Sequence, residues 1–161
     1  MQLNGQPETI ERVNTLTFDI FGTVLDLAGS LVPPLEKLLQ DCNAPESLNG
    51  ADVWNHWRLR QRLEQYQDNI IMLGHSGYLE VKKRALLYTL RMLKIEFTYE
   101  KVDEFMKAYH ELIPFQDAVS GLKRLGTKYK LVILSSGEEW YLKQLVKNNI
   151  IFKKSGTLSD S

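Results

Sequence analysis

Residues 16–26 have the sequence LTFDIFGTVLD, an apolar run that is interrupted by one acid and followed by Gly-Thr. The pattern predicts a buried strand that presents Asp19 at its carboxyl-terminal edge, which is the edge where open α/β sheets bind ligands. Gly22 permits a sharp turn with positive φ, and the Thr23 hydroxyl could hydrogen-bond the Asp19 carboxylate. We therefore predict an oriented carboxylate, the alternative being an ordinary Asp at the start of a turn.

A second junction between a strand and a turn is predicted at residues 131–138. Leu131 to Leu134 form an apolar run with β-branched members, which is typical of a strand buried on both faces. Ser135, Ser136 and Gly137 follow, and Glu138 opens a helix. Backbone N–H groups at such a turn can bind an oxyanion. A Ser- and Gly-containing turn without function is the alternative.

The residues between the two junctions are predicted to be mainly helical. Pro33 and Pro34 suit the first turn of a helix that follows a loop at residues 27–30. Over residues 51–112 apolar side chains recur at helical spacing, with a break at 74–77. Ser76 and Thr98 are expected N-caps, and Pro114 should end the block. Since this block is far longer than an ordinary crossover, we expect a helical cap at 47–113 inserted into a core formed by 1–46 and 114–161.

Composition limits the classes of function. With 161 residues and 43% hydrophobic content, the chain can bury a core of its own. Lys plus Arg and Asp plus Glu number 20 each, which offers no electrostatic case for nucleic acid or an anionic membrane. Cys42 is the only cysteine, as expected in a reducing compartment. Residues 1–13 lack the apolar core of a signal peptide, so we expect a soluble, cytoplasmic protein.

The first junction resembles the first motif of the haloacid dehalogenase superfamily, whose Asp is the nucleophile, and the second junction resembles the superfamily's second motif. The resemblance implies a doubly wound, Rossmann-like parallel sheet with an inserted helical cap. Phe21 stands where the phosphatases carry a second Asp, so the likeness is greatest to the L-2-haloacid dehalogenases. A departing halide needs no proton, whereas the alkoxide of a phosphate ester does. An aromatic ring at this position also removes a carboxylate that would help to bind Mg²⁺.

The resemblance also implies roles for individual residues. Asp19 and Thr23 would be catalytic, with Asp19 attacking a small 2-haloacid to form an aspartyl ester that water hydrolyses to a 2-hydroxyacid. Within Trp57-Arg58-Leu59-Arg60-Gln61, Arg58 best matches the Arg that receives the halide, because a guanidinium is permanently charged. Arg60 and Arg62 are competing neighbours, and a solvated surface charge is the alternative. The expected substrate-binding residues are Phe21, Arg58, Ser135 and Ser136, of which Ser136 replaces the family's usual Asn.

Other expectations concern cofactors, partners and the end of the chain. His56, His75 and His110 lack the close spacing of a sequence-local metal site. We expect no cofactor, with Mg²⁺ only if the chain were a phosphatase of the same superfamily. The family's later Lys and acids would lie beyond Ser161, so the core is expected to be incomplete, and a non-catalytic truncated protein is a further alternative. The expected partner is a small 2-haloacid, with no nucleic acid and no membrane, and an open sheet edge would favour a homodimer.

Overall fold

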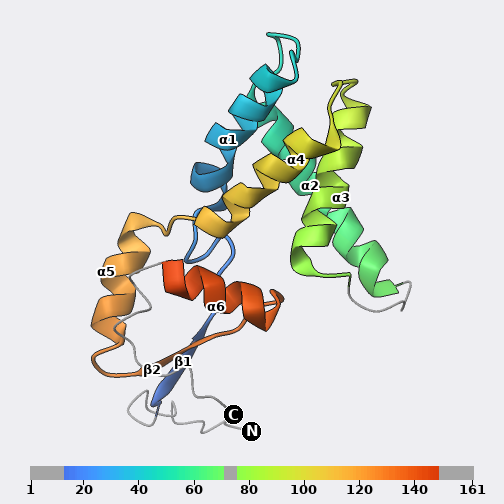
Figure 1. Ribbon diagram of the computed structural model, residues 1–161. Helices are drawn as coiled ribbons and strands as arrows, with labels where there is room; N and C mark the ends of the chain where they lie inside the picture. The colour runs from blue at the N-terminus through green and yellow to red at the C-terminus, as the bar shows by residue number, and fades with distance from the viewer. Residues whose placement is uncertain (1–12, 71–75, 149–161) are drawn as a thin grey trace, which may run out of the picture.

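The computed structural model describes residues 13–70 and 76–148. The expected leader, part of the predicted break at 74–77 and the residues after 148 lie outside the described residues. Helices α1 to α4 form one group, and the two strands lie with α5 and α6 at the other end of the molecule (Figure 1). This arrangement matches the expected α/β class with a large helical component. The predicted boundaries of the cap, 47–113, stay a prediction.

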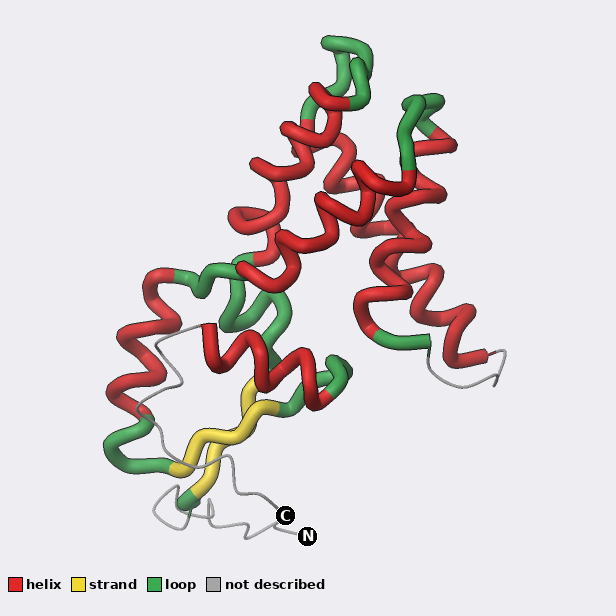
Figure 2. The backbone as a smooth tube through the Cα atoms, viewed as in Figure 1, coloured by secondary structure: helices red, strands yellow, loops and turns green. Residues whose placement is uncertain are grey.

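The sheet of the described residues consists of two parallel strands (Figure 2). β1, Thr15–Phe18, pairs with β2, Lys130–Ile133, so that Phe18 lies opposite Ile133. The pairing continues past β2, because the N–H of Leu134 donates to the carbonyl of Phe18 at 2.8 Å. The carboxyl ends of both strands therefore meet at one edge, as predicted.

Burial of the strands differs from the expectation. Both strands alternate exposed and half-buried positions along their length. The predictions of a buried first strand and of a second strand buried on both faces are therefore wrong within the described residues. The physical reason is that, within the described residues, one face of the sheet packs on the core: Phe18, Leu131 and Ile133 lie against it, and the side chains between them point to the other face.

Helix α1, Leu27–Asp41, begins earlier than predicted. The Asp26 carboxylate caps it by accepting a hydrogen bond from the N–H of Gly29 at 2.8 Å. The predicted loop at 27–30 is thus the first turn of the helix, and Pro33 and Pro34 lie inside it. Leucines at helical spacing bury one face of α1 against α2 and α4.

The helical block consists of α2, Gly50–Ile70, α3, Tyr78–Met92, α4, Tyr99–Met106, and the 3₁₀ helix η2, Lys107–Glu111. Thr98 caps α4 by accepting from the N–H of Lys101 at 3.4 Å, as predicted. The prediction for Ser76 is wrong: Gly77, with φ of +101°, is the N-cap of α3. The Ser76 hydroxyl donates to the Asp68 carboxylate instead.

Aromatic side chains form the centre of the helical group. Trp57 is fully buried and meets Trp54 and Phe105 edge-on, with ring centroids 5.5 and 5.4 Å apart. The indole N–H of Trp57 donates to the backbone carbonyl of Lys82 at 2.9 Å, which joins α2 to α3. Trp54 and Trp57 are therefore core residues of the helical group.

Helices α5, Gln116–Leu125, and α6, Glu139–Asn148, follow the return to the sheet. α6 is tied to the helical group, because the Tyr141 hydroxyl donates to the carbonyl of Tyr109 at 2.7 Å and Asn148 Nδ2 donates to the carbonyl of His110 at 2.9 Å. The edge of the sheet and the helical group therefore face each other. None of the helices in residues 13–70 and 76–148 is long and apolar enough to cross a membrane.

Candidate active site

Asp19 directly follows β1 and is exposed at the carboxyl edge of the sheet. The Thr23 hydroxyl donates to Asp19 Oδ2 at 2.8 Å, which confirms the predicted hydrogen bond. The intervening turn is held by the N–H groups of Val24 and Leu25, which both donate to the carbonyl of Ile20. Gly22 has φ of +86° at a place with ample room for a Cβ, so the backbone angle, not space, favours glycine. The turn therefore holds one carboxylate oxygen and leaves Oδ1 for other partners.

The Ser135-Ser136-Gly137 turn lies at the same edge, one residue beyond the last hydrogen bond between the strands. Ser135 is half-buried, and its hydroxyl oxygen accepts a hydrogen bond from the N–H of Gly137 at 3.2 Å. The hydroxyl proton stays available for an acceptor. Ser136 is exposed. The parallel pairing thus brings Asp19 and Ser135 to one end of the sheet, as the sequence predicts.

Phe21 links this edge to the helical group. Its ring stacks on Tyr78 of α3, with centroids 4.2 Å apart and planes inclined by 16°, and it also lies 5.8 Å from the Tyr141 ring. A Cβ on Gly137 would lie 3.0 Å from the Phe21 ring and 3.2 Å from Leu142. The absence of a side chain at Gly137 therefore lets the turn approach the aromatic stack.

Arg58 is the arginine of α2 that shares surroundings with Asp19. Burial raises the pKa of Tyr78, the charge of Arg58 opposes that rise, and the charge of Asp19 adds to it, so both charges lie near this one ring. Arg60 instead pairs with Glu64 at 2.5 Å and stacks on the Tyr88 ring. Arg62 is exposed. The structure thus separates the three candidates and brings Arg58 near the predicted site.

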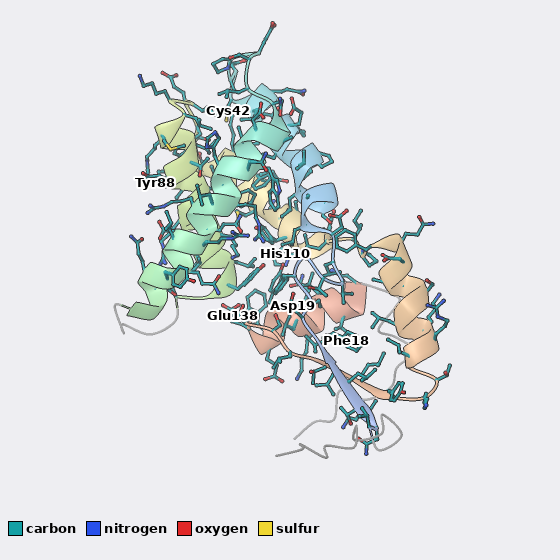
Figure 3. The ribbon with its side chains drawn as sticks, turned by 180° about the vertical axis from the view of Figure 1, so that it is seen from behind. Phe18, Asp19, Cys42, Tyr88, His110 and Glu138 are labelled. Carbon is teal, nitrogen blue, oxygen red and sulfur yellow. The ribbon has the colours of Figure 1, made fainter. Side chains whose placement is uncertain are left out.

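Glu138 also lies at the carboxyl edge of the sheet, whereas the sequence predicts only that it begins a helix. Its Oε1 accepts a hydrogen bond from the N–H of Tyr78 at 2.8 Å, joining the Ser-Ser-Gly turn to the start of α3. A Cβ on Gly77 would lie 2.5 Å from the same oxygen. Figure 3 shows Asp19 and Glu138 between the strands and the helices. In the sequence, only Gly77 marks the place where Tyr78 begins a helix. Nothing in the neighbouring residues indicates that the N–H of Tyr78 binds Glu138, 60 residues later.

Side chains that could bind a metal are scattered over the described part of the chain. Among residues 13–70 and 76–148, no group of three or more His, Cys, Asp or Glu side chains could hold a metal ion. His75 lies outside the described residues. The expectation that the reaction needs no cofactor stays a prediction.

Comparison with known proteins shows which enzymes this chain resembles in sequence. No family model matches the chain. The chain is 29% identical over 136 residues to (S)-2-haloacid dehalogenase of Xanthobacter autotrophicus, in a match that covers 84% of this chain and 50% of the relative. It is 23% identical over 141 residues to haloacetate dehalogenase H-2 of Moraxella sp. (strain B), covering 87% and 59% of the two chains. The chain resembles the L-2-haloacid dehalogenases.

A solved structure supports the same resemblance. The solved L-2-haloacid dehalogenase from Xanthobacter autotrophicus superposes with a TM-score of 0.67 at 27% identity, over 84% of this chain and 51% of that one. The α/β fold class and the resemblance to haloacid dehalogenases are therefore confirmed. The chain spans about half the length of that dehalogenase.

Proposed function

We propose that this chain is a hydrolytic dehalogenase, which converts small 2-haloacids into 2-hydroxyacids through an aspartyl ester. The observation that carries the proposal is the orientation of Asp19 by Thr23 at the carboxyl edge of the sheet. Relatives named as haloacid and haloacetate dehalogenases support it. The Phe21–Tyr78 stack supplies an apolar surface at this edge.

The first step in this proposal is attack on carbon. Because Thr23 engages Oδ2 of Asp19, Oδ1 carries the lone pair that forms the new C–O bond. The carbon–halogen bond breaks on the opposite side, the halide leaves with the electron pair, and the carbon centre is inverted. The halide takes no proton, so this step needs no general acid.

Two groups are placed to recognise the substrate. The Ser135 hydroxyl and the backbone N–H groups of its turn would hold the substrate carboxylate. Arg58 would stabilise the negative charge that grows on the leaving halide. A bound substrate would displace water from the exposed Asp19 carboxylate, which strengthens it as a nucleophile. In the second step, water attacks the ester carbonyl carbon and the bond from that carbon to the substrate oxygen breaks. One proton of the water goes to the departing 2-hydroxyacid and the other to solvent, so that the Asp19 carboxylate is regenerated.

The phosphatase alternative is disfavoured by one residue. Phe21 packs an aromatic ring against Tyr78 at the position where a phosphatase of this superfamily carries its second Asp. That ring can neither protonate an alkoxide nor bind Mg²⁺. We therefore propose a reaction without a metal cofactor.

Counting halide ions released per chain from L-2-chloropropionate tests the proposal. Continued release beyond one ion per chain is expected, and Asp19→Asn should abolish it, whereas Asp41→Asn, which changes an exposed carboxylate paired with Lys37, should leave it unchanged. Release that stops at one ion per chain would limit the chain to the attack step. Halide release by Asp19→Asn at the rate of the unchanged protein would refute the nucleophile, and chelator-sensitive phosphate release from a phosphomonoester would favour the phosphatase.

A further inference from the structure

Glu138 is a carboxylate at the edge of the sheet that the proposed mechanism does not use. It lies between the Ser135-Ser136-Gly137 turn and the first residue of α6. Its Oε1 accepts from the N–H of Tyr78 at 2.8 Å, whereas its Oε2 is buried and has no hydrogen-bond partner among the described residues. A buried carboxylate oxygen without a donor is unfavourable, because it has lost its hydration without gaining a partner. Oε2 is therefore an acceptor that a bound water could satisfy.

The pairing of the strands brings Glu138 to the same edge as Asp19. β1 and β2 run parallel, so the turns that follow them lie together. The two turns are in contact, since a Cβ on Gly137 would lie 3.0 Å from the Phe21 ring. Glu138 is the next residue after Gly137, and Phe21 lies two residues after Asp19. The two carboxylates thus belong to two turns that pack on each other, and both are labelled in Figure 3.

Hydrolysis of the aspartyl ester is assisted by a group that takes a proton from the attacking water. Asp19 is itself esterified at this stage, and the carboxylate of Asp26, at the end of the same turn, caps α1. Burial raises the pKa of Tyr78 and that of Tyr141, so both hydroxyls keep their protons near neutral pH. Within the two turns, residues 19–26 and 135–138, Glu138 is the carboxylate with an oxygen left for water.

We propose that Glu138 is the general base of the second step, a role that rests on the proposed function. Oε2 holds the water and takes one of its protons while the water oxygen attacks the ester carbonyl carbon. The bond from that carbon to the substrate oxygen breaks, and Glu138 gives the same proton to the departing 2-hydroxyacid. The carboxyl group of Asp19 then loses the second proton to solvent. The N–H of Tyr78 holds the other oxygen and so orients the base.

Glu138→Gln tests this role, because glutamine keeps an oxygen for the N–H of Tyr78 and removes the base. Halide release from L-2-chloropropionate and the mass of the intact chain are followed together. We expect Glu138→Gln to release one halide ion per chain at the unchanged rate, to gain the mass of one carboxyethyl group, and to turn over roughly 100-fold more slowly or less. Glu139→Gln is the matched control, because Glu139 is exposed and pairs with Lys143 at 2.7 Å. It should turn over as the unchanged protein does.

The other outcomes separate a failure of the base from a failure of the proposed function. Full turnover by Glu138→Gln, or loss of its first halide ion, would overturn the base and leave the proposed function standing. Release by the unchanged protein that stops at one ion, with the ester retained, would also overturn the base. No halide and no ester from the unchanged protein would refute both. His110 has a buried Nδ1 without a described partner, so slow ester hydrolysis in His110→Gln with full turnover in Glu138→Gln would overturn the assignment to Glu138.

Discussion

The hydroxyl of Thr23 donates a 2.8 Å hydrogen bond to Oδ2 of Asp19. This bond selects one carboxylate oxygen and one rotamer of a residue that is otherwise exposed. Thr23→Val keeps the shape of the side chain and removes the donor. Because a hydrogen bond to a charged group contributes about 1.5–3 kcal/mol, the rate of halide release should fall roughly 10- to 100-fold.

The initial rate of halide release at saturating substrate measures this effect, with Thr23→Ser as the variant that restores the hydroxyl. The thermal midpoint of Thr23→Val should stay near that of the unchanged protein, since Thr23 is exposed. A full rate in Thr23→Val would show that the hydrogen bond has no part in orienting the nucleophile.

Gly137 lies against the ring of Phe21, and Gly137→Ala is expected to lower the free energy of unfolding by about 1–3 kcal/mol. The new Cβ would lie 3.0 Å from Phe21 and 3.2 Å from Leu142. Gly121→Ala is the matched control, because a Cβ at this position of α5 meets nothing within 4 Å. That control should stabilise the helix by up to about 1 kcal/mol. Urea unfolding measures both, and equal effects of the two substitutions would contradict the close packing at Gly137.

Glu138 joins the second turn to α3 through the N–H of Tyr78. Glu138→Ala should lower the free energy of unfolding by about 1–3 kcal/mol, since it leaves that N–H without its acceptor. Glu139→Ala is the adjacent control, because Glu139 is exposed and pairs with Lys143 on its own helix. Hydrogen exchange at Tyr78 should accelerate in Glu138→Ala and not in Glu139→Ala. Unchanged protection of Tyr78 in both variants would exclude the link.

Burial lowers the pKa of Lys82, which should make the free energy of unfolding depend on pH. Its pKa is about 8 in the folded protein and 10.5 ordinarily, so the unfolded chain binds more protons between these values. Stability should therefore rise with pH through this window, and below pH 8 the buried charge costs up to about 3 kcal/mol. Tyr78 stays neutral over the window because burial raises its pKa.

Lys82→Met should accordingly raise the free energy of unfolding at pH 7 and remove this part of the rise with pH. Urea unfolding between pH 7 and 9.5 measures the difference between the two proteins. A Lys82→Met variant that is less stable at pH 7, with an unchanged slope against pH, would contradict a destabilising buried charge.

Much of the first junction could be predicted because its interactions are local. Thr23 and Asp19 are four residues apart, and the positive φ of Gly22 follows from the turn between them. The N-cap at Thr98 is local in the same sense. The start of α1 was missed because two prolines suggested a first turn, whereas the Asp26 cap placed that turn six residues earlier.

Local sequence was enough to predict the order of the elements and the two strand ends that carry Asp19 and Ser135, because strand pattern, turn residues and caps depend on neighbours within a few positions. Three features became visible only in the folded chain: the arginine that shares the surroundings of Asp19, the hydrogen-bond partner of Glu138, and the burial of Lys82. Burial and electrostatic surroundings arise from contacts between segments distant in the chain, so no local pattern encodes them.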